Sequence, residues 1–172
     1  MTRDIQWDEG AKALREAFET GGAFIVAVDG NGKANPMTIG WGLIGIVWSR
    51  PVFAAYIRVS RYTHECLREA ATFTINVPRP GELVDELMLC GTKSGRDLDK
   101  AAEAGLTMIA SKVVETPTIK ECALHYECRT VARSQQTRAD FNSNDVLDQF
   151  YATGDHHLIV HGEIVASYAM DG

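Results

Sequence analysis

Two short clusters of cations and hydroxyls lie in the middle of this sequence. The first consists of Arg58, Ser60, Arg61 and Thr63, and the second of Lys93, Ser94 and Arg96. A guanidinium can bind phosphate oxygens through two parallel hydrogen bonds, and hydroxyls and a lysine ammonium add further donors. The first cluster also stands where a helix is expected to begin, so that free backbone N–H groups add positive potential. The two clusters together predict a site for a small phosphate-bearing anion.

The same residues fit a second interpretation. An arginine at a corner between a strand and a helix can bind backbone carbonyls, or it can pair with Glu65 and Glu69. Short motifs of this kind are weak indicators of function. Residue types alone therefore leave both interpretations open.

A third feature is the segment Asn-Pro-Met-Thr-Ile-Gly-Trp-Gly at residues 35–42. Proline and glycine weaken a strand unless the backbone must kink or approach a ligand closely. Backbone amides beside Asn35 and Thr38 would suit the polar edge of a flat ligand, and an apolar wall could come from Met37, Ile39 and Trp41. The alternative, which the residues alone favour, is a bulged barrel strand with Met37 and Trp41 in the core.

Histidines gather near the C-terminus, in Gly-Asp-His-His at residues 154–157 and at His161. Strand alternation places His156 on the apolar face, and His157 and His161 on the opposite face. Residues four apart on a strand lie roughly 13 Å apart, too far to share one metal ion. No metal site is expected.

Composition and charge limit the classes of protein that fit. The chain has 172 residues, 45% hydrophobic, and a formal net charge of -6, which is typical of one globular domain, here residues 1–172. The acidic balance argues against broad binding to nucleic acid or to an anionic membrane surface. Residues 58–100 contain seven Lys+Arg and seven Asp+Glu, so their net charge is zero. The whole net negative charge of the chain therefore lies outside the segment with the two clusters.

The first ten residues carry charge and no apolar stretch, and no apolar run approaches the roughly 18 residues of a membrane helix. We therefore expect a cytoplasmic protein. Its cysteines form no Cys-x-x-Cys pair and are expected to be reduced, buried thiols: Cys66, Cys90, Cys122 and Cys128.

Hydrophobic periodicity predicts the elements that position these residues. Helices are expected at residues 10–19, from a cap at Ser60 or Thr63, around 83–88 and over 97–104. Strands are expected at 23–29, 35–41, 42–48, 52–59, 73–77, 122–133 and 158–168, with a hairpin turn at 29–33, a break at residues 49–51 and a polar loop or lid at 134–149. Apolar and polar residues alternate along strand 122–133, which predicts a half-buried strand with His125 and Glu127 on its polar face. Strands in hairpin order point to an antiparallel barrel.

Five motifs in order carry a resemblance that covers about residues 20–168: NPMTIGWG, RPVFAAYIRVSRYTHE, FTINVP, CGTKSGRDLDK and GDHHLIVHGEI. In this order they resemble the flavin reductase-like family, also called flavoredoxin-like, of FMN-binding split barrels. The resemblance implies a mainly β fold with short helices, an antiparallel split β-barrel of Greek-key type. It also implies a homodimer that binds FMN at the subunit interface.

The resemblance extends to individual positions. The backbone of the strand segment would meet the isoalloxazine ring, through Asn35, Pro36, Met37, Thr38, Ile39 and Gly40. The family's phosphate-binding Ser-Arg-x-Thr matches Ser60, Arg61 and Thr63, with Arg58 in support, and a loop closing over the phosphate and ribityl side matches Lys93, Ser94 and Lys100. Cys90 would line the pocket or be a small buried hydrophobe. His156 matches the family's Gly-Asp-His as a proton donor facing the flavin or nicotinamide, or is a barrel-rim histidine.

The function that follows is an FMN-binding oxidoreductase, a flavin reductase that transfers hydride from NADH or NADPH to flavin N5 and supplies a monooxygenase or another electron acceptor. The alternative is an electron-transfer flavoprotein that keeps its FMN without nicotinamide turnover. A flavin-binding or metal-binding barrel with no redox role of its own is a third hypothesis. The sequence does not separate them.

Overall fold

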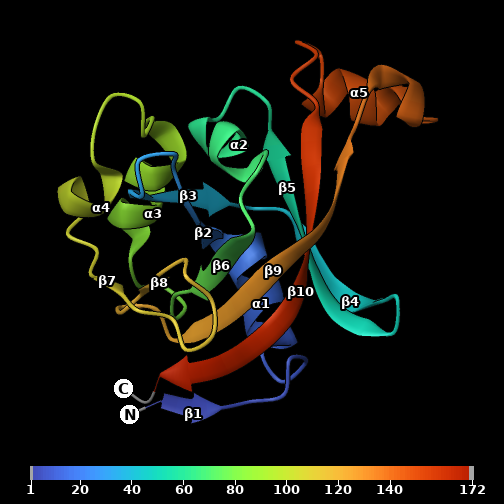
Figure 1. Cartoon of the computed structure of the whole chain (residues 1–172). Coiled ribbons are helices and arrows are strands. Elements are labelled where there is room, and N and C mark those ends of the chain that lie inside the picture. The colour runs from blue at the N-terminus through green and yellow to red at the C-terminus, as the bar shows by residue number, and fades with distance from the viewer. Residues whose placement is uncertain (1, 171–172) are drawn as a thin grey trace.

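The computed structural model describes residues 2–170 and shows an antiparallel sheet that curls into an open barrel (Figure 1). The strands are β1 (Thr2–Asp4), β2 (Ala23–Val28), β3 (Ala34–Ile39), β4 (Gly42–Val47), β5 (Arg50–Arg58), β6 (Thr72–Val77), β9 (Leu124–Gln135) and β10 (His157–Met170), with a separate pair of β7 (Met108–Ile109) and β8 (Thr118–Ile119). The sheet order is β3-β2-β6-β9-β10-β5-β4, and β1 pairs with β10. No strand pairing within residues 2–170 joins β3 to β4. The expected mainly β, antiparallel split-barrel fold is confirmed.

Short helices pack around this barrel. They are α1 (Ala11–Thr20), α2 (Tyr62–Leu67), α3 (Val84–Thr92), α4 (Lys100–Glu103) and α5 (Asn144–Phe150), with a 3-10 helix at Arg138–Asp140. In Figure 1, α2, α3 and α4 gather on the side of β3. Helix α5 lies near the C-terminal end of β9 and the beginning of β10. The Thr38 hydroxyl of β3 donates to the Leu87 carbonyl of α3 at 2.6 Å, which fixes α3 against the edge strand. None of the helices described here has the length and apolar character needed to span a membrane.

The core forms from the inward side chains of the long strands. Its largest buried members include Ile25, Phe53, Phe73 and Tyr126, and Leu14 of α1 packs against them. Burial of these side chains is the main force that holds the curled sheet together.

Two hairpin turns set the strand register. At residues 29–33 the Asp29 carboxylate accepts the backbone N–H groups of Asn31 and Lys33, and Gly32 has φ of 82°, so the predicted turn is confirmed. In the β4–β5 hairpin, Trp48 and Ser49 have φ of 53° and 57°, the values that a two-residue turn requires. The break predicted at residues 49–51 is therefore shorter, and β5 already begins at Arg50.

Strand β9 differs from its predicted half-buried state. His125 and Glu127, expected on a polar face, are fully buried. The segment around β7 and β8 covers them: the Glu127 carboxylate accepts backbone N–H groups from residues 112–114, at 2.6 to 3.0 Å. His125 bonds to Asn76 at 2.8 Å and stacks on Tyr168. Sequence alternation cannot detect a cover that comes from a distant segment.

Two local predictions need correction. Helix α2 begins after Arg61 and has no side-chain cap, so neither Ser60 nor Thr63 caps it. The polar stretch at 134–149 is not simply a loop, because it contains the end of β9, the 3-10 helix and most of α5.

Candidate functional site

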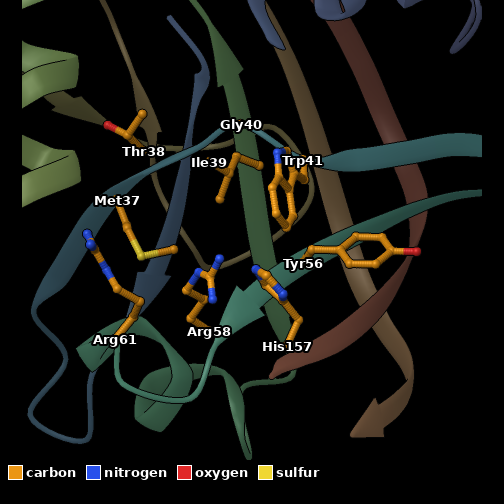
Figure 2. Close-up of a pocket in the computed structure, with 9 residues that line it drawn as sticks. All are labelled: Met37, Thr38, Ile39, Gly40, Trp41, Tyr56, Arg58, Arg61 and His157. Atoms are coloured by element: carbon orange, nitrogen blue, oxygen red, sulfur yellow. The ribbon is translucent and has the colours of Figure 1, made fainter. Parts of the chain in front are cut away.

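A cleft opens beside the end of β3, and we call it the strand cleft (Figure 2). Its volume is about 190 Å³, and it is lined by Met37, Thr38, Ile39, Gly40, Trp41, Tyr56, Arg58, Arg61 and His157. Strand β3 is the edge of the sheet, so the backbone groups on its free side have no strand partner. The cleft thus combines unpaired backbone groups with an apolar and aromatic wall.

Gly40 and Trp41 connect β3 to β4, and both line the strand cleft. Met37 is buried, as the core interpretation predicted, but it also lines the strand cleft. Trp41 is 39% exposed and belongs to the wall, so it is not a core residue.

A second cleft, the cation cleft, lies between α2 and the loop after α3. Its volume is about 240 Å³, and it is lined by Ser60, Arg61, Tyr62, Thr63, Thr92, Lys93, Ser94, Gly95, Arg96 and Lys100. Among these described residues four are cations and none carries a carboxylate. Apart from Arg58, the residues of the two clusters identified in the sequence therefore come together in one place.

Arg61 lines both clefts. Its guanidinium donates to the carbonyls of Gly91 at 2.6 Å and Cys90 at 3.2 Å, near the end of α3. Burial lowers the pKa of Arg61, which nevertheless stays charged at neutral pH. The carbonyl-binding interpretation thus describes two contacts of a group that has five N–H donors, and it leaves donors for an anion.

Lys100 is the most buried cation of the cation cleft, with 3% of its surface exposed. Its ammonium lies 3.5 Å from the Cys90 carbonyl, a long hydrogen bond. Burial lowers the pKa of Lys100 to about 8, and the charge on Arg61 acts in the same direction. An anion in this cleft would stabilise the charged lysine.

The loop that carries Lys93 and Ser94 lies close against β3. A side chain at Gly95 would collide with Asn35 Oδ1 and with the Tyr62 ring, so glycine permits this approach. Asn35 is buried, and its Oδ1 has no hydrogen-bond partner among the described residues. Arg96 in the same loop pairs with Glu65, and its guanidinium lies over the Tyr62 ring.

Arg58 has a different place from the one predicted for it. It lines the strand cleft, not the cation cleft, and donates to the carbonyls of Asp155 at 2.9 Å and Phe150 at 3.1 Å. Its guanidinium also lies over the rings of Trp41 and Tyr151. Arg58 thus connects β5 to the segment that carries α5.

The histidine that reaches the strand cleft is His157. It is buried, its ring lies 5.0 Å from that of Trp41, and burial lowers its pKa to about 4 with a further contribution from Arg58. His156 precedes β10, stacks on Tyr151 and lines neither cleft. The alternation put His157 on the face opposite Leu158, which β10 keeps, but it does not extend to His156, because β10 begins at His157.

The remaining predicted residues divide as follows. Cys90 is fully buried beside Leu87 in a second core cluster, and burial raises the pKa of its thiol to about 11, which fits a small hydrophobe. Cys66 is half-buried, the other cysteines are buried, and all four are free thiols.

Of the predicted site residues, the ones that line neither cleft are Asn35, Pro36, Cys90 and His156. Sequence reasoning did not single out Tyr56 or His157 as site residues, although both lie inside the quoted motifs RPVFAAYIRVSRYTHE and GDHHLIVHGEI.

Comparisons with known proteins agree with this geometry. The family described as flavin reductase like domain matches residues 15–172. An uncharacterized protein of Archaeoglobus fulgidus is 35% identical over 80% of this chain and 67% of its own length. Another, of Aeropyrum pernix, is 28% identical over 94% of this chain and 54% of its own length. The chain thus spans about half to two thirds of the length of these curated relatives.

Solved structures with the same fold include two flavoredoxins. That of Methanosarcina acetivorans is 26% identical, with a TM-score of 0.67 over 87% of this chain and 69% of that one. That of Desulfovibrio vulgaris is 22% identical, with a TM-score of 0.70 over 88% and 70%. An FMN-binding domain of a flavin reductases-like enzyme from Shewanella baltica is 16% identical, with a TM-score of 0.67 over 98% and 77%.

Proposed function

Because this chain belongs to the flavin reductase-like family, we propose that it binds FMN and acts as a flavin reductase that transfers hydride from NADH or NADPH to flavin N5. One observation supports this proposal above the others: the strand cleft and the cation cleft meet at Arg61. FMN has a flat ring at one end and a phosphate at the other, so it needs two such clefts side by side.

The cation cleft suits the phosphate. FMN's phosphate carries about two negative charges at neutral pH. Arg61, Lys93 and Lys100 would neutralise it, and the hydroxyls of Thr63 and Ser94 would add donors. The absence of a carboxylate among the described lining residues removes the main source of repulsion.

The strand cleft suits the ring. Unpaired backbone groups along Met37 to Gly40 would bind its polar edge, and Trp41 and Tyr56 would cover its apolar part. When bound, FMN supplies the ring that accepts hydride, and the protein contributes orientation and exclusion of water. The Gly-x-Gly-x-x-Gly spacing at Gly40, Gly42 and Gly45 runs into strand β4 and does not open a helix, so it is not a dinucleotide fingerprint. A nicotinamide would therefore dock transiently.

A homodimer with FMN at its interface is part of this proposal. Strand β4 is an open sheet edge, and large apolar side chains of its hairpin are exposed, with Leu43 at 63% and Ile46 and Trp48 at 59%. An exposed apolar edge of this kind is typical of a surface that pairs with another chain. Light scattering on the purified protein should give the mass of a dimer, and a monomer at micromolar concentration would contradict this part.

The second candidate is an electron-transfer flavoprotein, since two of the similar structures are flavoredoxins. The same residues would hold FMN in both cases. Titration with FMN, followed by steady-state oxidation of NADH and NADPH, tests both functions. Tight FMN binding with nicotinamide turnover supports the reductase, FMN binding without turnover supports the electron carrier, and no FMN binding contradicts both.

A further inference from the structure

Tyr151 lies behind His157 and does not itself line the strand cleft. Its hydroxyl is 2.8 Å from His157 Nδ1, and both side chains are buried. Tyr151 follows directly after α5, so this contact links the segment at 136–156 to the wall of the cleft.

The imidazole of His157 is held on several sides. The rings of Trp41, Tyr151 and Tyr56 lie 5.0, 5.5 and 6.0 Å from it. Its backbone carbonyl accepts the Gln136 N–H at 2.9 Å. The remaining freedom is a flip of the ring about its own axis, and a hydrogen bond at Nδ1 opposes that flip.

The direction of this hydrogen bond follows from the donors and acceptors that are present. The Tyr151 hydroxyl has no other acceptor among the described residues, and a buried O–H without an acceptor is costly. Burial lowers the pKa of His157 to about 4, so the imidazole is neutral at pH 7 and has a free lone pair on one nitrogen. The Tyr151 O–H therefore donates to Nδ1, and the ring proton sits on Nε2.

Nε2 makes no hydrogen bond within residues 2–170, and Figure 2 shows the ring turned toward Arg58 and Trp41. An N–H on this atom is then free to meet a ligand. Both side-chain donors at this end of the cleft, His157 and Arg58, select for a hydrogen-bond acceptor and against another donor.

We propose that Tyr151 is a positioning residue that holds His157 as the Nε2–H tautomer, with this N–H directed into the strand cleft, where it donates to a carbonyl oxygen of a planar ring ligand. The identity of the ligand rests on the function proposed above. The carbonyl could belong to the flavin ring or to the carboxamide of a nicotinamide, and the experiment below separates the two.

The tautomer can be measured without any ligand. In ¹⁵N-histidine-labelled protein, long-range ¹H–¹⁵N correlation spectra should show His157 protonated at Nε2 and unprotonated at Nδ1, with His157→Gln identifying its signals. Tyr151→Phe should produce a mixture of tautomers or a switch to Nδ1–H. Tyr56→Phe is the matched control, since it removes a hydroxyl from the same cleft that has no bond to His157, and it should leave the tautomer unchanged.

Binding measurements identify the source of the carbonyl. Tyr151→Phe should either lower FMN affinity or raise the KM for the nicotinamide, by about fivefold, which is the usual effect of one neutral hydrogen bond. The kcat should change by less than about twofold. A change in FMN affinity assigns the carbonyl to the flavin, and a change in KM assigns it to the nicotinamide.

The proposal is overturned if His157 carries its proton on Nδ1, if Tyr151→Phe leaves the tautomer unchanged in a folded protein, or if both affinities are unaffected. A wild-type protein that binds neither ligand contradicts the proposed function and the ligand contact together. The tautomer spectra then still decide whether Tyr151 positions His157.

Discussion

The buried side chains of Asn35 and Thr63 are joined by a hydrogen bond of 2.8 Å, although they are 28 positions apart in the chain. Asn35 belongs to β3, which forms one wall of the strand cleft, and Thr63 belongs to α2, which lines the cation cleft. This bond therefore fixes the distance between the two clefts. A ligand that spans them needs that distance to be constant.

Thr63→Val should disturb this connection. The change removes the acceptor of the Asn35 amide and leaves a buried donor without a partner, so the free energy of unfolding should fall by about 1–2 kcal/mol. FMN affinity should fall as well. Urea denaturation and FMN titration measure the two effects. Thr20→Val, whose exposed hydroxyl bonds only to its own helix, should change neither, and a matching loss in both variants would contradict the prediction.

Arg61→Ala should weaken FMN binding by about 1.5–3 kcal/mol, the usual loss for a charge-assisted contact. Fluorescence titration measures the affinity. Arg15→Ala removes an exposed arginine that pairs with Glu19 on α1 and should leave FMN affinity unchanged. Unchanged affinity in a folded Arg61→Ala protein would remove Arg61 from the site.

Lys100 should make FMN affinity depend on pH. Its pKa is lowered to about 8 by burial, so the free protein loses this positive charge as the pH rises through that value. Affinity for the FMN dianion should therefore fall above about pH 8, and Lys100→Met should remove this fall. Lys93→Met is the control: Lys93 is exposed in the same cleft, so the variant should bind more weakly at every pH but keep the fall.

Lys100 should also make stability depend on pH, but in the opposite direction from FMN affinity. The pKa of Lys100 is lower in the folded than in the unfolded chain, so the unfolded chain binds more protons between about pH 8 and the ordinary value of 10.5. The free energy of unfolding without ligand should rise with pH across this window, relative to Lys100→Met. Parallel curves for the two proteins would contradict the burial argument.

Arg58 should act through the α5 segment and not through the phosphate. Arg58→Met removes hydrogen bonds to the carbonyls of Asp155 and Phe150. Amide hydrogen exchange in residues 144–156 should become faster, and FMN and riboflavin should lose affinity by the same factor. A selective loss for FMN would place Arg58 beside the phosphate instead.

Local patterns predicted much of this fold because they depend on neighbouring residues. The turn at 29–33, helix α1 and the cation clusters all follow from short spacings that the structure keeps. The order of the five motifs was enough to identify the family and its split-barrel fold. Counting charges over residues 58–100 also separated the segment that carries the cation clusters from the acidic remainder of the chain.

The features that the sequence did not reveal depend on contacts between distant segments. His125 and Glu127 are buried because residues 108–119 fold across β9. His157 replaces His156 in the cleft because the residues around Tyr151 cover the start of β10 on its second face. Arg58 lies outside the cation cleft because its guanidinium binds the carbonyls of residues 150 and 155. None of these contacts has a signature in the sequence around the residue itself.

Comparing FMN with riboflavin tests the central claim most directly, because the two ligands share the ring and differ by the phosphate. The account predicts that wild-type protein binds FMN at least about tenfold more tightly than riboflavin, and that Arg61→Ala removes most of this difference while Arg15→Ala keeps it. Equal affinity for the two ligands, or binding of neither, would contradict the account.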